Sequence, residues 1–469
     1  MTKFGKLSIY AFLAFQLGGC GTLGIGPDFT GPTAEESLTQ EQQALNAPVK
    51  WVISPEADGE IASAWSAIVS DPLLDAYIEK ALENNPSLRS SAENVARSEA
   101  ILRQARSELF PNVGANLFGG GGGLLEGSGF SDNYSGGVNA SWEADLWGGI
   151  KSGILTSKYD LESTRATYQS ARQALIASVA LAYVVSIEAD KLIALNELTV
   201  AAQVEVLRIV RVRYELGAAS RRELVLAESD VANVQDNLVL IKSAKREADK
   251  SLEILLGEYP DANIDVAADF PSISDSYSAG IPAELLRRRP DVIASEFAVL
   301  SAFQATRTAK ADAWPRLSLS GGVNTGAPNL FDILNPTSIA YSLGAQLTDT
   351  LFDGGFSEAR IEVENADQRQ ALANYGQTVL DAYLDVETVL DDILTLEQRA
   401  PFVAKSAAEA RETVALAEIQ YKEGDIDLID VLTFRQRSFQ ADSTQITLNR
   451  QVIQARISLY LALGGAIHY

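Results

Sequence analysis

The sequence of 469 residues holds very little of the material from which metal and redox sites are built. It contains one Cys, one His and one Met, whereas a structural zinc site needs about four such ligands. The histidine, His468, lies beside the C-terminus, and no Gly-x-Ser-x-Gly, P-loop or Rossmann glycine pattern occurs. The carboxylates are scattered and form no evident acid and base pair. These absences argue against an enzyme and against a bound metal or cofactor.

Positive charge and long apolar runs are also scarce. The chain has 38 Lys and Arg against 62 Asp and Glu, a net charge of −24, which argues against a nucleic-acid surface. The acidic excess is explained equally well by a solvated surface and by an acid-lined function. Beyond the N-terminus, no stretch reaches the roughly 18 to 20 apolar residues of a spanning helix. Any further membrane contact must therefore use β-strands or lipid.

The N-terminus resembles the lipobox of bacterial lipoproteins. Lys3 and Lys6 precede an apolar stretch, and small residues lead to Cys20 in Leu17-Gly18-Gly19-Cys20. The resemblance implies a signal peptide over residues 1–19, with a diacylglycerol and an acyl chain attached covalently at Cys20. Gly21, where inner-membrane lipoproteins have Asp, favours the outer membrane. The alternative is an ordinary signal peptide with an incidental Cys. Residues 21–55 lack a sustained period and predict an extended tether.

Most of the chain repeats one series of short motifs twice. The two sets occur in the same order, and partners lie roughly 205 residues apart, far beyond the 20 to 50 residues of solenoid repeats. The sequence therefore predicts two pseudo-symmetric copies of one long unit that share a core. The pairs are Asn85-Pro86 with Arg289-Pro290, Phe110-Pro111 with Trp314-Pro315, Leu146-Trp147-Gly148-Gly149 with Leu351-Phe352-Asp353-Gly354-Gly355, Tyr214-Glu215-Leu216-Gly217 with Tyr421-Lys422-Glu423-Gly424, and Leu256-Gly257 with Leu463-Gly464.

Each of the two sequence repeats contains segments in which apolar and polar residues alternate. In the first repeat these segments are 112–117 and 134–146, and in the second repeat they are 317–320 and 342–348. This period predicts one β-hairpin per unit, apolar on one side and small or polar on the other. Nothing apolar remains to cover these strands, so we expect the apolar side to face lipid and the polar side to face water. Four strands cannot close a barrel, and open edges in lipid are costly, so other chains must supply the missing strands.

Very long helices follow each hairpin. Residues 153–216 read as one helix that ends at Gly217, and a second helix returns over about 220–256. The second repeat has the same pattern, with a helix over 356–423, a break at Gly424 and a returning helix over about 427–463. Pro401 is expected to interrupt and kink its helix. Helices of this length are expected to pair as coiled coils.

These features together resemble the outer-membrane efflux factors of the TolC type, especially the acylated NodT-like and OprM-like branch. The resemblance extends from the lipobox and Gly26-Pro27-Asp28-Phe29 to both Tyr-x-x-Gly tips, and the ordered double set of motifs carries it. It implies a membrane α+β fold: a trimeric 12-stranded β-barrel, with four strands per chain, continued by a long 12-helix coiled-coil α-barrel, with two pseudo-symmetric repeats per chain.

This fold divides the chain into a series of segments. They are the signal peptide 1–19, the lipid-anchored tether 20–64, repeat 1 over 65–258 with its β-hairpin at about 112–147 and its helical tip at 214–220, an equatorial connection over 259–280, repeat 2 over 281–464 with its β-hairpin at about 316–350 and its tip at 421–427, and a C-terminal tail over 465–469.

The resemblance implies passive conduction, with no bond made or broken. The chain would be the outer-membrane exit duct of a tripartite multidrug efflux system in a Gram-negative bacterium. Its partners would be two identical copies, outer-membrane lipid, a periplasmic adaptor and an inner-membrane pump of the resistance-nodulation-division type. The alternative is a periplasmic coiled-coil scaffold or adaptor lipoprotein, which would share the helices and Cys20 but would not need two amphipathic hairpins.

The resemblance also assigns residues to a periplasmic gate. In TolC-like gates, acids a few residues beyond the second tip glycine ring the narrowest point, and the matching acid is Asp430, with Asp427 and Asp425 nearby. Three symmetry-related carboxylates would collect cations and repel anions. The alternative is that these acids only solvate a helix start, where the macrodipole favours Asp.

Other tip residues receive roles in the same way. Arg222 and Glu223 stand where the family holds gate-locking contacts, and Tyr421 would reach such a group from a neighbouring hairpin. Where the family pattern has a locking Arg, this chain has Ile426, and where some members have a second Asp, it has Thr433. These differences point to a single acidic ring. The expected docking surface for an adaptor consists of Tyr214, Gly217 and Gly424.

Overall fold

The computed structural model describes residues 26–54, 69–122, 131–273 and 277–465. Cys20 and His468 lie outside these residues, as does the predicted signal peptide. The chain forms two compact units. The first comprises residues 1–41, 96–163 and 295–375, and the second comprises residues 42–95, 164–294 and 376–469. Each unit therefore draws on both repeats of the sequence.

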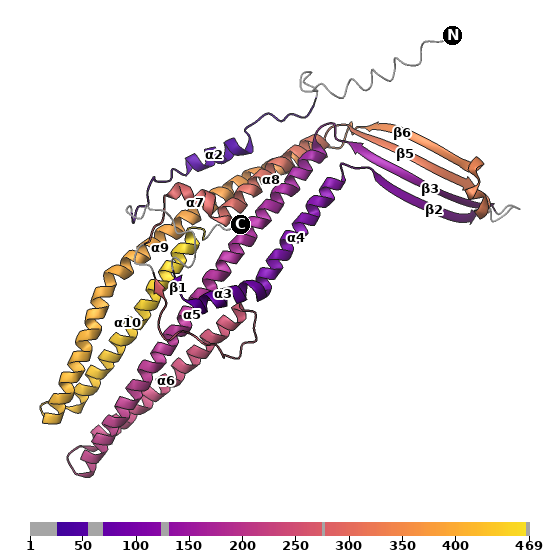
Figure 1. The fold of residues 1–469 in the computed structure, drawn as a ribbon. Helices are drawn as coiled ribbons and strands as arrows, with labels where there is room; N and C mark the ends of the chain where they lie inside the picture. Colours follow the sequence, from indigo (N-terminus) through magenta and orange to yellow (C-terminus); the bar gives the residue numbers. More distant parts are fainter. Residues whose placement is uncertain (1–25, 55–68, 123–130, 274–276, 466–469) are drawn as a thin grey trace, which may run out of the picture. The chain divides into compact units, whose positions relative to one another are not determined.

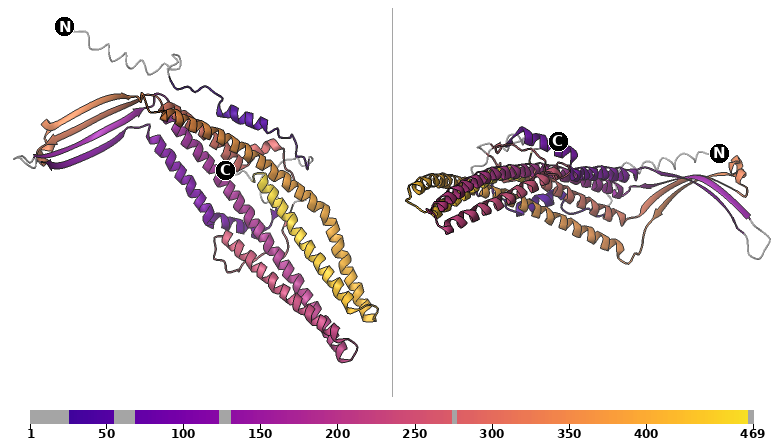
Figure 2. Two further views of the ribbon diagram at one scale, coloured as in Figure 1. Left: turned by 180° about the vertical axis from the view of Figure 1, so that it is seen from behind. Right: turned by 90° about the horizontal axis from the view of Figure 1, so that it is seen from below.

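The first unit contains a four-stranded antiparallel sheet in the order β2-β3-β5-β6 (Figures 1 and 2). Its strands are β2 (Asn112–Gly122), β3 (Ser131–Ala144), β5 (Arg316–Ala327) and β6 (Ile339–Thr348). The two central strands, β3 and β5, come from different repeats and pair directly. Among the described residues, β2 and β6 each pair along one edge only, so two rows of backbone amides and carbonyls face outward at the ends of the sheet.

The register of the sheet separates its two faces by polarity. One continuous row across the strands is Ala115, Val138, Val323 and Tyr341, and the adjacent row on the opposite face is Gly114, Asn139, Gly322 and Ser342. Because directly paired residues share a face, most apolar residues of the four strands lie together, while Phe118 lies on the other face in the row of Ser135. Their exposure is high, with Val138 at 51% and Leu343 at 87%. The sheet therefore presents a broad uncovered apolar face.

Tryptophans join the strand entries to the helices of the first unit. The rings of Trp147 and Trp314 lie 5.1 Å apart, and the Trp147 Nε1 donates a 2.7 Å hydrogen bond to the carbonyl oxygen of Pro315. Trp147 lies two residues before the start of α5 (Gly149–Glu215), and Pro315 directly precedes β5. The start of the long helix of repeat 1 is thereby fixed to the strand entry of repeat 2.

The N-terminal segment is not wholly extended, which corrects the expectation for residues 21–55. It contains α2 (Ala34–Ala44), whose start has a reciprocal cap: the Glu36 amide donates to Thr33 Oγ1 at 3.2 Å, and the Thr33 amide donates to the Glu36 carboxylate at 2.8 Å. Thr followed by Glu three residues later is the capping-box pattern. That local signal outweighs the absence of an apolar period over the segment as a whole.

The second unit contains most of two helical hairpins, whose first helices begin in the first unit. α5 returns as α6 (Arg221–Leu255), and α9 (Phe356–Glu423) returns as α10 (Leu428–Ala462). α9 continues through Pro401, so the expected interruption is wrong: a proline removes one backbone donor but leaves the rest of a long hydrogen-bonded ladder intact. Among the described residues, no helix combines the length and the apolar character needed to cross a membrane.

The remaining α-helices and strands are shorter. They are α3 (Pro72–Asn84), α4 (Pro86–Ser107), α7 (Pro282–Arg288), α8 (Pro290–Asp312), and the two-residue strands β1 (Val69–Ser70) and β4 (Ser272–Ile273), which pair with each other. α3 begins as its sequence indicates, because Asp71 accepts hydrogen bonds from the amides of Leu73 and Leu74. A core around Leu74, Tyr183 and Leu252 joins α3, α5 and α6.

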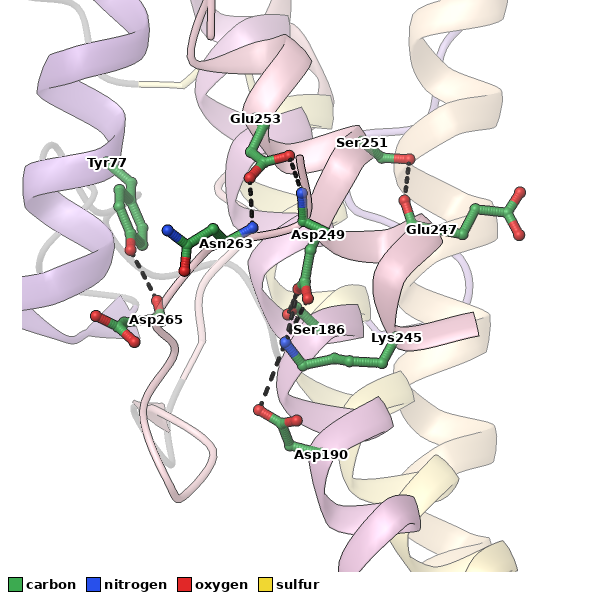
Figure 3. A network of polar contacts seen from close by, with 11 residues as sticks. Tyr77, Ser186, Asp190, Lys245, Glu247, Asp249, Ser251, Glu253, Asn263 and Asp265 are labelled. Atoms are coloured by element: carbon green, nitrogen blue, oxygen red, sulfur yellow. Dashed lines mark hydrogen bonds and ion pairs between the residues drawn. The ribbon is translucent and has the colours of Figure 1, made fainter. Parts of the chain in front are cut away.

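A buried polar network holds the connection after α6 in place (Figure 3). Asp249 accepts a 2.5 Å hydrogen bond from Ser186 Oγ and two 2.7 Å bonds from Lys245 Nζ. One turn further along α6, the Glu253 carboxylate accepts from the amides of Ala262 and Asn263 at 2.8 and 2.7 Å. These bonds satisfy two carboxylates that are at most 3% exposed, and they fix the start of the 259–280 segment against α6.

Candidate functional site: the tips of the helical hairpins

Both hairpin tips end their first helix in the same way. Gly217 (φ 73°) and Gly424 (φ 89°) have left-handed backbones, and the amide of the residue that follows each one donates to a carbonyl five residues back, Ala218 to Arg213 and Asp425 to Gln420. This is the Schellman pattern, which glycine favours because it lacks a Cβ. The two predicted tip glycines therefore terminate α5 and α9 by an identical mechanism.

The returning helices also begin alike. The Ser220 amide donates to the Glu223 carboxylate at 2.6 Å, and the Asp427 amide donates to the Asp430 carboxylate at 3.3 Å. Glu223 lies six residues after Gly217 and Asp430 six after Gly424, so the two acids occupy one position in the two repeats. The hydrogen bonds from Ser220 hold the pKa of Glu223 below its ordinary value. Both acids cap a helix start.

Tyr421 lies at the meeting point of the two tips. Its ring centroid is 5.0 Å from the guanidinium carbon of Arg213 on α5, a cation–π geometry. Within this chain it thus reaches the other hairpin at Arg213, one turn before the tip. Around it the two hairpins share an apolar core, which we call the tip cluster: Val206, Val210, Leu224, Ala227, Leu428 and Leu432.

The remaining predicted tip residues face solvent. Arg222, Asp425, Asp427 and Asp430 are exposed, as is Tyr214 at 37%. Thr433, at the position of the missing second acid, donates from Oγ1 to the carbonyl of Ile429 at 2.8 Å. The second tip therefore displays several carboxylates without a basic residue between Gly424 and Asp430, while the first tip carries Arg221 and Arg222.

One pair of tip contacts was not anticipated from the sequence. In the first hairpin Arg211 of α5 binds Glu228 of α6 at 3.3 Å, and in the second Glu418 of α9 binds Arg435 of α10 at 2.6 Å. The repeats are offset by 424 − 217 = 207 residues, which maps Arg211 onto Glu418 and Glu228 onto Arg435. The same bridge thus occurs twice with its charges exchanged. Comparison of charged residues that lie 207 positions apart in the sequence could have revealed this exchange of charges.

The chemistry available at the tips is electrostatic. Among the described residues, no cluster of three or more His, Cys, Asp or Glu side chains is arranged to hold a metal ion. What the tips offer is exposed charge of both signs at the helix ends, together with a small apolar core. Such an arrangement can be opened, closed or bound by another helical protein without forming a covalent bond.

Comparison with known sequences finds a protein family that matches both repeats. The sequence model of the outer membrane efflux protein family matches residues 77–258 and 281–465, most of the chain. The chain belongs to the outer membrane efflux protein family. The two matched segments correspond to the two repeats and include both strand pairs and both hairpins.

Individual relatives span nearly the whole chain. The pyoverdine export outer membrane protein OpmQ of Pseudomonas aeruginosa is 28% identical over 90% of this chain and 91% of its own length. The cation efflux system protein CusC of Escherichia coli strain K12 is 25% identical over 97% of this chain and 98% of its own. Among solved structures, the outer-membrane channel OprN has a TM-score of 0.82 at 25% identity and covers 94% of this chain and 99% of its own.

A second structure agrees in fold. The CmeC outer membrane channel of Campylobacter jejuni has a TM-score of 0.86 at 20% identity and covers 94% of this chain and 95% of its own. The fold class expected from the sequence is therefore confirmed: the protein is a TolC-type channel in which three chains complete the β-barrel and the helical barrel. It is an outer-membrane efflux channel that works with a periplasmic adaptor and an inner-membrane pump.

Proposed function

We propose that this chain is the lipid-anchored exit duct of a resistance-nodulation-division efflux system and that its conduction is gated at the hairpin tips. Cys20 carries the lipid, Asp430 forms the acidic ring, and the surface around Tyr214, Gly217 and Gly424 receives the adaptor. The duct conducts passively, and the inner-membrane pump selects the cargo.

The sheet is the observation that supports conduction most directly. It has one exposed apolar face and one polar face, and within the described part of the chain its two edges are unpaired. Unpaired backbone groups cost several kcal/mol each in hydrocarbon, so the edges call for β2 of one chain to pair with β6 of the next. Closed in this way, the polar face lines a water-filled lumen. A periplasmic scaffold has no use for such a sheet, which disfavours the alternative function.

The tip geometry supports a gate. Asp430 is exposed, and within the described residues its carboxylate accepts one bond, from the Asp427 amide, which leaves lone pairs open to solvent. Capping and gating are therefore compatible uses of the same carboxylate. In a trimer three copies of Asp430 would repel one another and attract cations.

Planar-bilayer recording of the purified full-length trimer tests the proposed function. We expect small single-channel currents that divalent and trivalent cations reduce from the side exposed to the tips. Purified trimers that insert but give no current, or currents insensitive to multivalent cations on both sides, would contradict the gated duct.

The class of pump is tested separately. Cross-linking in cells, followed by purification through the channel, should recover an adaptor and a pump with the large periplasmic domains of the resistance-nodulation-division class. Recovery of a pump of another class alone would contradict this assignment while leaving the duct intact.

A further inference from the structure

Two successive core positions of α5, next to the tip cluster, carry amide side chains. Residues 196, 203 and 210 follow one another at the heptad spacing, and so do 199 and 206, which places Asn196 and Gln203 in the same seam as Val206 and Val210. Asn196 is 1% exposed and Gln203 is 7% exposed. The seam of α5 therefore changes from apolar to polar directly beyond the tip cluster.

α10 changes in the same region. Leu428 and Leu432 belong to the tip cluster, and the core positions that follow are held by Arg435, Ser438 and Asp442. Arg435 forms an ion pair with Glu418, and Asp442 forms an ion pair with Arg411, with 3.1 Å between Asp442 Oδ1 and Arg411 Nε. We call the following set the polar band: Asn196, Gln203, Arg435, Ser438 and Asp442.

The polar band borders a cavity of about 200 Å³ between α5, α9 and α10. Gln203, Arg435, Ser438 and Asp442 line it, and Asn196, which does not line it, lies one heptad before Gln203 on α5. Among the described residues, neither side-chain polar atom of Asn196 has a hydrogen-bond partner, and neither do Nε and Nη1 of Arg435. An unpaired buried polar group costs about 1–3 kcal/mol. A water needs about 30 Å³ and two to four polar partners, so the cavity has the size and the chemistry to hold several waters.

The fold itself does not require polar side chains at these positions. With the offset of 207 residues, Asn196 corresponds to Val403, Gln203 to Ala410 and Ser438 to Val231. Val231 is buried and Val403 packs against a second apolar core. The other repeat thus accommodates apolar residues at all three places, and the polar choices are particular to the surface where the two hairpins meet.

We propose that water occupies the polar band and uncouples the hairpin tips from the rest of the coiled coil, so that the tip cluster repacks as one unit when the channel opens. Apolar burial is the main source of coiled-coil stability, and the band interrupts it between the small tip cluster and the larger cores around Tyr183 and Leu390. A polar, hydrated layer can separate at little cost, because water replaces each lost contact. The inference rests on the proposed gating at the tips.

Hydrogen exchange of the full-length trimer in detergent tests the proposal without any substitution. Amides of α5 over residues 206–214, on the tip side of the band, should exchange about tenfold faster than those over residues 176–187. The change in rate should fall at residues 196–203, because local opening of the tip stops at the band. A gradual fraying from the tip, with no step at the band, would overturn the proposal.

A variant that copies the other repeat gives the second test. Asn196→Val with Gln203→Ala and Ser438→Val should slow exchange in the tip cluster about tenfold and reduce the frequency of channel openings. The matched control is Asn233→Val with Gln235→Ala, at exposed positions of α6, which should change neither. Unchanged exchange at the tip in the first variant would overturn the inference. If the wild-type trimer conducts no current, the proposed function fails, while the exchange step still tests the band.

Discussion

Asn85 and Arg289 donate to equivalent carbonyl oxygens at the ends of the two returning helices. Asn85 Nδ2 binds the carbonyl of Leu255 at 2.9 Å, and Arg289 Nη1 binds that of Ala462 at 3.1 Å. Leu255 ends α6 and Ala462 ends α10, and each donor directly precedes a proline that begins a helix. A short amide and a long guanidinium thus perform the same task, because each meets carbonyls that the helix leaves unpaired.

Removal of the Arg289 side chain is expected to cost more stability than removal of the Asn85 side chain. Arg289 also binds Asp291 at 2.7 Å and Asp385 at 2.9 Å, with only 11% of its side chain exposed. Hydrogen bonds to charged groups contribute about 1.5–3 kcal/mol and neutral ones about 0.5–1.5, so Arg289→Ala should lower the thermal midpoint, followed by circular dichroism, more than Asn85→Ala. The control is Arg208→Ala, an exposed bridge to Glu205, which should change little. Equal midpoints for the Arg289 and Asn85 variants would contradict the expectation.

Two glycines with similar backbones should respond very differently to alanine. Gly257 (φ 76°) and Gly217 (φ 73°) both lie in the left-handed region, where a Cβ costs about 1–2 kcal/mol. An added Cβ at Gly257 would also lie 2.6 Å from the carbonyl oxygen of Asn84, whereas at Gly217 it meets no heavy atom of the described residues within 4 Å. Gly257→Ala should therefore reduce trimer yield and thermal stability clearly, and Gly217→Ala only slightly. The reverse order would show that the close approach at Asn84 relaxes freely.

Asp430 offers a way to separate capping from gating. Glutamine at this position keeps an acceptor for the Asp427 amide but removes the charge, while alanine removes both. If the three carboxylates attract cations, Asp430→Gln and Asp430→Ala should both weaken block by multivalent cations and raise conductance in planar bilayers. Glu36→Gln, in the capping box of α2, is the control for neutralising a capping acid outside the hairpin tips. Wild-type block in the glutamine variant would leave Asp430 as a helix cap alone.

The two faces of β3 should tolerate charge unequally. Val138 lies on the apolar face, and Asn139 lies on the opposite face, where its Nδ2 donates to Asn116 Oδ1 at 2.9 Å. Arg on a lipid-facing strand position costs about 2–4 kcal/mol near the bilayer midplane. Val138→Arg should therefore impair insertion, measured as heat-resistant trimer in outer-membrane fractions, much more than Asn139→Arg. Equal insertion of both variants would contradict the proposed lipid face.

The lipid anchor stays a prediction from the sequence. Cys20→Ser should abolish metabolic labelling of the chain with a radioactive fatty acid, because the thioether requires the thiol. Substitution of the neighbouring Gly21 by Ser should leave labelling intact, since it keeps the thiol. Label retained in the Cys20 variant would remove the lipoprotein assignment.

The long-range architecture could be read from the sequence because its signals are periodic and occur twice. The alternation around Val138 marks a strand, and Gly217 and Gly424 mark helix ends, since these depend on backbone preferences within a few residues. The capping box at Thr33 was missed although the pattern is local, because the surrounding composition suggested an extended chain. These four residues predict the start of a helix, whereas the average composition of the segment does not.

The contacts of the site were less accessible to sequence reasoning. Tyr421 could be assigned to the tip, but its partner Arg213 depends on the rotation of two helices about their axes, which no short motif encodes. The buried pair of Lys245 and Asp249 gives the same lesson: the spacing suggests a surface ion pair, and only tertiary packing decides that it is buried with Ser186. The domain boundaries and the roles of the tip residues remain predictions.

The exchanged salt bridge constrains how this gene can vary by recombination. Arg211 faces Glu228 in one hairpin and Glu418 faces Arg435 in the other. A crossover that swapped α5 for α9 alone would bring Glu418 against Glu228 in one product and Arg211 against Arg435 in the other. Whole hairpins, by contrast, would keep their charges matched. Each hairpin therefore carries its own matched pair, whereas the exchange of a single helix between the repeats would place like charges together at this position.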